Sequence, residues 1–247
     1  MGLITALSGL GPSALHMANT FNNTRMIGAT KPTKYNQAEA EGSLLNALEG
    51  YLQDNARTPI QDLNLNDNVP KPGLEGFHEV LREPNKYAGS GRWPDKGNNS
   101  YSINFNPNAD RSYFAHELGH VAAQQFDFGD IVHKLDNQPA VKKALLGALL
   151  LAPGTAAALE AGDNDMDTSL ALGLAAASPT ILKESLATKH GLAIMDKAGM
   201  RADLGQRGRL AGGLLSYVGA PIAIAAGANI VGNQFDDPAA QQGELPM

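Results

Sequence analysis

The chain of 247 residues contains no cysteine. This absence excludes disulfide scaffolds and cysteine-based zinc sites, so any bound metal must be held by His, Asp or Glu. A dense basic block is also missing, and the formal net charge is −6. Because nucleic-acid-binding domains concentrate Lys and Arg on one surface, nucleic acid is not expected as a main partner. The length suits one large domain, or one domain with an insertion, with a sizeable core.

Basic residues are absent from long parts of the chain. All 19 Lys and Arg lie between Arg25 and Arg209, and none falls within residues 144–182. Residues 1–24 carry no formal charge. That segment lacks the basic start of a secretory signal, and Ala6 stands where myristoylation needs Ser or Thr. We therefore expect an interfacial or buried apolar helix at this end.

The polar region that follows predicts helices separated by loops. Leucines at helical spacing predict a helix over residues 38–55, and a short helix is expected over residues 74–82. The stretches 56–73 and 88–99 are rich in Pro, Gly and Asn and are expected to be loops.

Residues 100–106 alternate apolar and polar side chains, which predicts a half-buried strand. A turn follows, and Asp110 is a suitable N-cap for a helix over residues 111–126. Zinc peptidases bind substrate as an added strand along a sheet edge, so this strand is a candidate for that edge. The alternative, equally supported, is that it is only a core strand.

The expected helix carries the sequence His-Glu-Leu-Gly-His at residues 116–120. Residues i and i+4 share one helical face, so His116 and His120 can bind one ion. Glu117 lies beside that face and can take a proton from a water that zinc has acidified. Leu118 is expected to face the core, and Gly119 to allow another helix to approach closely. The alternative is a chance pattern on a structural helix, but the preceding strand, turn and N-cap favour the zinc site.

A catalytic zinc usually has three protein ligands plus water. A third His six residues after the motif is excluded, because position 126 is Phe. His133 is expected to lie beyond the end of the helix. The best candidate is Glu184, because Ala187 and Gly191 share its helical face and would let the two helices lie close together. The alternative is that Glu184 only caps a helix after Pro179.

These residues carry a resemblance to a known family. The strand, the His-Glu-Leu-Gly-His helix and the later Glu-x-x-Ala-x-x-x-Gly helix resemble the membrane gluzincin peptidases, such as the bacterial heat-shock membrane protease and the prenyl-protein endopeptidase. The resemblance covers about residues 100–126 and 181–199. It implies His116, His120 and Glu184 as Zn²⁺ ligands and Glu117 as the base. The family usually has Asp four residues after its ligand Glu, where this chain has Thr188.

Two apolar arms, residues 144–159 and 168–182, are uncharged but shorter than the roughly 20 residues of a membrane span. A third uncharged run, residues 210–233, is long enough to span. The ends of these runs nearest the motif helices are basic, and the opposite ends are acidic. Lys and Arg bias sets orientation, so the sequence predicts membrane association with the catalytic side cytoplasmic. A soluble bundle of Ala- and Gly-rich helices is the alternative, favoured by Pro153 and Pro179 in the short arms.

The sequence thus predicts a predominantly α-helical α+β fold with a gluzincin-like zinc peptidase domain and a small sheet. The expected segments are an apolar N-terminal segment (1–24), the first part of the peptidase domain (25–143), an apolar helical hairpin (144–182), the second part of the peptidase domain (183–209), an apolar, membrane-spanning helix (210–232) and an acidic tail (233–247). The expected function is a zinc-dependent endopeptidase acting on proteins or peptides at a membrane. The alternative is a structural or membrane-inserting protein, for example of a virion or secretion assembly, that retains the fold with little activity.

Overall fold

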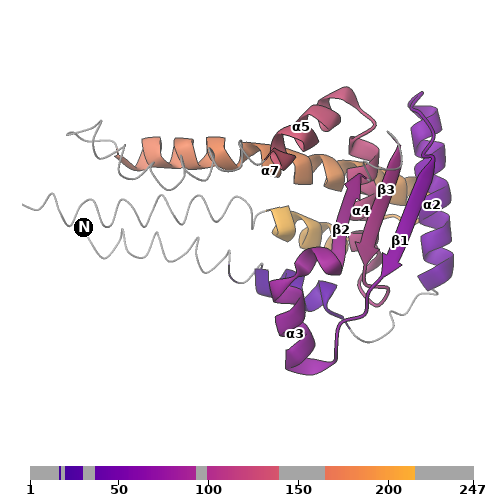
Figure 1. Ribbon diagram of the computed structural model, residues 1–247, viewed down its shortest axis with the longest axis horizontal. Coiled ribbons are helices and arrows are strands. Elements are labelled where there is room, and N and C mark those ends of the chain that lie inside the picture. The colour runs from indigo at the N-terminus through magenta and orange to yellow at the C-terminus, as the bar shows by residue number, and fades with distance from the viewer. Residues whose placement is uncertain (1–16, 18–19, 30–36, 93–98, 139–164, 215–247) are drawn as a thin grey trace, which may run out of the picture. The chain divides into compact units, whose positions relative to one another are not determined.

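The computed structural model describes residues 17, 20–29, 37–92, 99–138 and 165–214 (Figure 1). The chain divides into two compact units. One comprises residues 19–135 and 182–214, and it contains the sheet and both predicted motif helices. The other comprises residues 1–18, 136–181 and 215–247. The fold is mostly helical with one small sheet, which confirms the predicted α+β class.

The sheet has three strands in the order β1-β3-β2. Strand β3 (Ser100–Phe105) confirms the strand predicted over residues 100–106, and its side chains alternate as expected, with Ile103 fully buried. It pairs in parallel with β1 (Asp62–Asp67) and antiparallel with β2 (Ala88–Arg92). Because both of its hydrogen-bonding edges are occupied, β3 cannot take an added substrate strand, and the edge role considered for it is wrong.

Strands β1 and β2 lie within segments 56–73 and 88–99, which were predicted to be loops. In β1 the apolar residues Leu63 and Leu65 alternate with Asn and Asp, which have low strand propensity and mask the pattern. Strand β2 reads Ala-Gly-Ser-Gly-Arg and has no apolar alternation at all. Both strands form because β3 offers them a partner, and pairing of that kind is set by tertiary contacts.

The described helices are α2 (Gln37–Asp54), α3 (Gly73–Arg82), α4 (Arg111–Ala123), α5 (Asp127–Asn137) and α7 (Asp165–Lys197), with a 3₁₀ turn η1 at Pro84–Lys86. Residues 20–27 and 204–214 are also helical. The helices predicted over residues 38–55 and 74–82 are therefore confirmed. The helix predicted over residues 111–126 ends three residues early, at Ala123, and a second helix begins at Asp127.

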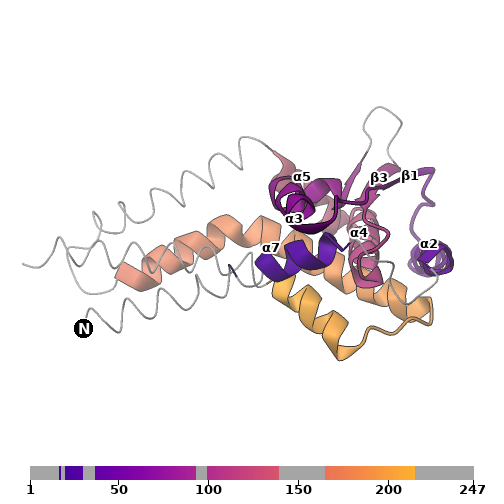
Figure 2. The same ribbon diagram turned by 90° about the horizontal axis from the view of Figure 1, so that it is seen from below.

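The apolar core lies between the sheet, α2, α4 and the C-terminal part of α7. Its fully buried members from these elements include Leu44, Leu48, Leu52, Tyr101, Ile103, Leu118, Val121, Ile194 and Met195. Figure 2 shows that the sheet lies on one side of α4 and that α7 passes on the other side of α4. Burying one such side chain contributes about 1.5–3 kcal/mol, so this cluster fixes where α4 and α7 lie in the domain.

Helix α7 is continuous from Asp165 to Lys197 and contains Pro179. Glu184 therefore lies in the interior of a helix, and the alternative that it only caps a helix after Pro179 is wrong. The second arm of the predicted hairpin is part of this same helix. The described residues do not include the first arm of the hairpin (144–159), the apolar segment 1–16 or most of the predicted helix 210–232. Among the residues that the structure describes, none of the helices combines the length and apolar character needed to cross a bilayer.

Candidate metal centre

The start of α4 is anchored by Asp110, the predicted N-cap. Its carboxylate accepts a hydrogen bond from the Ser112 backbone N–H at 2.9 Å. It also accepts from Gln206 Nε2 at 3.0 Å and pairs with Arg209 at 2.7 Å. Burial by itself would raise the pKa of Asp110, but these hydrogen bonds and the Arg209 charge hold the pKa below its usual value. The N-cap thus ties α4 to the segment that follows α7.

Helices α4 and α7 contact each other backbone to backbone. A Cβ atom added at Gly119 would lie 1.9 Å from the Ala187 carbonyl oxygen. One added at Gly191 would lie 2.5 Å from the Ala115 carbonyl oxygen. No real Cβ contact is so short, so only glycine fits at either position. The expectation that small residues let these two helices approach closely is confirmed.

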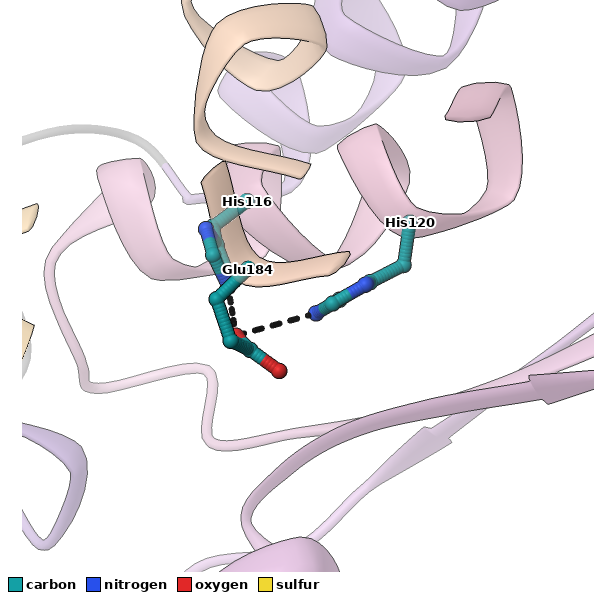
Figure 3. Close-up of side chains that lie close together, drawn as sticks. All are labelled: His116, His120 and Glu184. Atoms are coloured by element: carbon teal, nitrogen blue, oxygen red, sulfur yellow. Dashed lines mark hydrogen bonds and ion pairs between the residues drawn. The ribbon is translucent and has the colours of Figure 1, made fainter. Parts of the chain in front are cut away.

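This close approach brings three predicted ligands together (Figure 3). His116 and His120 come from α4, one turn apart, and Glu184 comes from α7. Glu184 Oε2 lies 3.1 Å from His116 Nε2 and 3.4 Å from His120 Nε2. One ligand atom from each residue lies within 4.8 Å of the other two, and all three side chains are largely buried. The group could hold a metal ion.

The donor set is one that divalent metal ions such as zinc accept. Two imidazoles and one carboxylate are a common ligand set of catalytic zinc. Tetrahedral ligands placed roughly 2.0–2.1 Å from the ion lie about 3.3–3.4 Å from one another. The Glu184–His116 and Glu184–His120 distances are close to that separation. The remaining separation, between His116 and His120, is within 4.8 Å, so the group could close around an ion.

The charges of the group are strongly coupled. Burial by itself would raise the pKa of Glu184, but the His116 and His120 rings outweigh burial and hold that pKa far below its usual value. Burial opposes protonation of His116, yet the Glu184 and Glu117 carboxylates outweigh it and raise the His116 pKa above 6.5. A proton on His116 is therefore stabilised by the Glu184 carboxylate, and a metal ion that binds here would displace that proton.

The two imidazoles are supported differently. His116 Nδ1 lies 3.1 Å from Thr188 Oγ1, so Thr188 can accept its N–H and leave Nε2 as the ligand atom. Thr188 thus restrains the orientation of the His116 ring. His120 Nδ1 is buried and makes no hydrogen bond within the described part of the chain. The His133 ring stands perpendicular to the His120 ring, with centroids 5.4 Å apart.

Glu117, the predicted base, is 6% exposed. Its Oε2 atom is buried without a hydrogen-bond partner among the described residues. It lines a cavity of about 10 Å³, roughly the space of one water molecule, together with Tyr87, Ala88 and Asn106. A water molecule in this cavity would give that oxygen a hydrogen-bond partner.

Two other histidines do not join the three ligands. His133 lies on α5, beyond the end of α4 as predicted. His190 points to another contact, since its Nδ1 lies 2.8 Å from the Tyr51 hydroxyl and its ring stacks on Phe126. Burial, followed by the Lys189 charge, lowers the His190 pKa to about 4.

Two contacts beside this group were not predicted from the sequence. Thr188 follows Glu184 by four residues, the same spacing as the two histidines, and this spacing could have placed it beside His116. The Lys183 Nζ atom lies 3.5 Å from Glu184 Oε1. A lysine next to a ligand in sequence carries no periodic signal, so only the structure reveals this contact.

Comparison of the chain with protein-family models, with curated proteins and with solved structures finds no match. The assignment of a function therefore depends on the geometry of this site and on the residues that carry the family resemblance.

Proposed function

We propose that the protein is a zinc-dependent endopeptidase of the gluzincin type. The observation that carries the proposal is the convergence of His116, His120 and Glu184 from two helices that are far apart in sequence. Glu117, one residue from the first ligand, adds a buried carboxylate with an unpartnered oxygen in the described part of the chain. Two imidazoles, a remote carboxylate and an adjacent free carboxylate are the groups that metal-assisted peptide hydrolysis requires.

Each of these residues has a distinct role in the proposed reaction. His116, His120 and Glu184 would hold zinc, which when bound lowers the pKa of a water to about 7 and polarises the peptide carbonyl. Glu117 accepts the proton released by the water and passes it to the departing amine. Thr188 fixes the ring orientation of His116. Burial of the ligands excludes bulk water and strengthens these interactions.

Strand β2 is the proposed docking edge for the peptide. It pairs with β3 along one edge, and its other edge has no strand partner in the described part of the chain. Tyr87 and Ala88, at the start of this strand, line the same small cavity as Glu117. An extended peptide that adds to β2 through main-chain hydrogen bonds would pass close to the base. Binding of this kind uses the backbone and accepts many sequences, which suits an endopeptidase.

Membrane association, with the catalytic side facing the cytoplasm, belongs to the proposal as well. It is supported by the uncharged runs 144–159 and 210–233 and by the basic residues at the ends nearest the motif helices. Reconstitution with lipid vesicles, followed by flotation, measures it directly. Recovery of the full chain with the vesicles at high salt is expected, and a protein that stays entirely in the aqueous fraction would contradict membrane association.

The test of the catalytic role compares wild type with Glu117→Gln, using a generic unfolded protein as substrate. Wild type is expected to cleave it, and the variant to lose at least about 100-fold in rate while keeping its zinc, because Glu117 is not a ligand. Glu49→Gln, an exposed glutamate on α2, is the matched control and should cleave normally. A zinc-loaded wild type that cleaves nothing, found at fixed stoichiometry in a larger particle, would favour the structural alternative.

A further inference from the structure

The two carboxylate oxygens of Glu184 have different partners. Oε2 lies 3.1 Å from His116 Nε2 and 3.4 Å from His120 Nε2. Oε1, the oxygen without a dashed line in Figure 3, lies 3.5 Å from the Lys183 ammonium. The side chains of Lys183 and Glu184 are only 20% and 11% exposed. The pair is therefore partly shielded from water, where an ion pair is stronger than on an open surface.

The difference between the two oxygens matters because a carboxylate can bind zinc in two ways. Bound through one oxygen, Glu184 would complete a set of three protein ligands and leave a fourth position open for water. Bound through both oxygens, it would add a further ligand atom, which with the water gives about five neighbours and crowds the water position. A group that holds the second oxygen away from the ion would therefore keep the fourth position open.

We propose that Lys183 is a positioning residue that holds Glu184 Oε1 and so makes Glu184 bind the metal through Oε2 alone. This inference rests on the proposed metal site. Oε2 is the oxygen that lies near both imidazoles, and the ammonium lies 3.5 Å from the other oxygen. Lys183 acts through Glu184 and does not itself touch the reacting peptide bond.

The chain offers a matched control for this effect. Lys189 lies on the same helix, six residues further along, and its side chain is exposed. It contributes charge near His190 and is not paired with Glu184. Lys189→Met therefore removes one positive charge from α7 without removing the contact at Oε1. Lys183→Arg keeps a cation that can reach Oε1, while Lys183→Met and Lys183→Gln do not.

The experiment is X-ray absorption at the zinc edge of the full-length protein loaded with one equivalent of zinc. Wild type, Lys183→Arg and Lys189→Met are expected to show about four nitrogen and oxygen neighbours. Lys183→Met and Lys183→Gln are expected to show about five, because the second Glu184 oxygen joins the ion. Peptide turnover in these two variants should fall about 10-fold, and zinc should remain bound.

The outcomes separate this inference from the proposed function. Unchanged coordination in both neutral variants, or about five neighbours already in wild type, would overturn the role of Lys183. Wild type that binds zinc with four neighbours but cleaves no peptide would contradict the peptidase function. In that case the coordination change in Lys183→Met and Lys183→Gln still decides whether Lys183 positions Glu184.

Discussion

Helix α4 is held in two different ways on its two sides. Toward the sheet and α2 it buries large apolar side chains, among them Phe114, Leu118 and Val121. Toward α7 it presents Gly119 to the Ala187 backbone, beside the group of His116, His120 and Glu184 that could hold a metal ion. Side-chain packing tolerates repacking of shape and volume, whereas contact between two backbones tolerates no added atom. The side of α4 that contacts the α7 backbone is also the side that aligns His116, His120 and Glu184.

Gly119→Ala is expected to have the largest effect on the contact between α4 and α7. The new Cβ would meet the Ala187 carbonyl oxygen at 1.9 Å, so α7 must move and carry Glu184 away from the imidazoles. We expect zinc affinity to fall by about 100-fold or more, because displacement by about 1 Å is enough for a loss of that size. Unfolding stability should also fall by about 1–3 kcal/mol. Zinc titration calorimetry and urea unfolding measure both.

The control for that variant is Gly42→Ala. Gly42 lies within α2, and a Cβ there would meet nothing within 4 Å. Because alanine favours a helix over glycine, this variant should gain up to about 1 kcal/mol and bind zinc normally. Equal zinc affinity in Gly119→Ala and Gly42→Ala would show that the close crossing does not position Glu184.

The opposite side of α4 is tested with Leu118→Ala. Leu118 is fully buried in the apolar core, so its truncation should cost about 2–5 kcal/mol of unfolding free energy. At low temperature and without denaturant, the folded variant should still bind one zinc with near wild-type affinity, since the crossing with α7 is untouched. Loss of zinc binding in a variant that circular dichroism shows to be folded would contradict the separation of the two sides.

Unfolding stability measured as a function of pH tests the contact between α7 and α2 at His190. His190 is buried against Tyr51 and Phe126, and its pKa is lowered to about 4 from 6.5. Between these values the unfolded chain binds a proton that the folded chain does not. Stability should therefore fall by on the order of 2 kcal/mol as pH decreases from 6.5 to 4. In His190→Gln, urea unfolding should show a smaller decrease over this interval, and identical pH profiles would argue against a buried neutral His190.

The smallest expected effect concerns the support of His116. Thr188→Val removes the hydroxyl that lies 3.1 Å from His116 Nδ1 and keeps the side-chain volume. Zinc affinity should fall about 10-fold, as is usual when a partner of a ligand imidazole is lost, while unfolding stability of the metal-free protein changes little. Competition with a chromophoric chelator measures the affinity. Thr188→Ser, which keeps the hydroxyl, should match wild type, and equal affinity of the Val and Ser variants would remove Thr188 from this role.

The sequence contained the features that depend on local pattern. The β3 strand, the Asp110 cap and the His116/His120 pair all follow from periodicity over a few residues, and each was predicted. The place of Glu184 beside the two imidazoles was predicted as well, because Gly119, Ala187 and Gly191 indicate a close crossing of helices. Strands β1 and β2 were missed, since their residues have low strand propensity and form strands only beside β3. The Lys183–Glu184 pairing was missed because it depends on where two flexible side chains point.

The most direct test of the account is the zinc content of wild type and of Glu184→Ala after dialysis against trace metal, measured by plasma mass spectrometry. Wild type should retain about one zinc per chain and the variant should lose nearly all of it, with Glu49→Ala as a folded control that keeps it. If Glu184→Ala retained as much zinc as wild type, the joining of α4 and α7 through a common ion would be refuted.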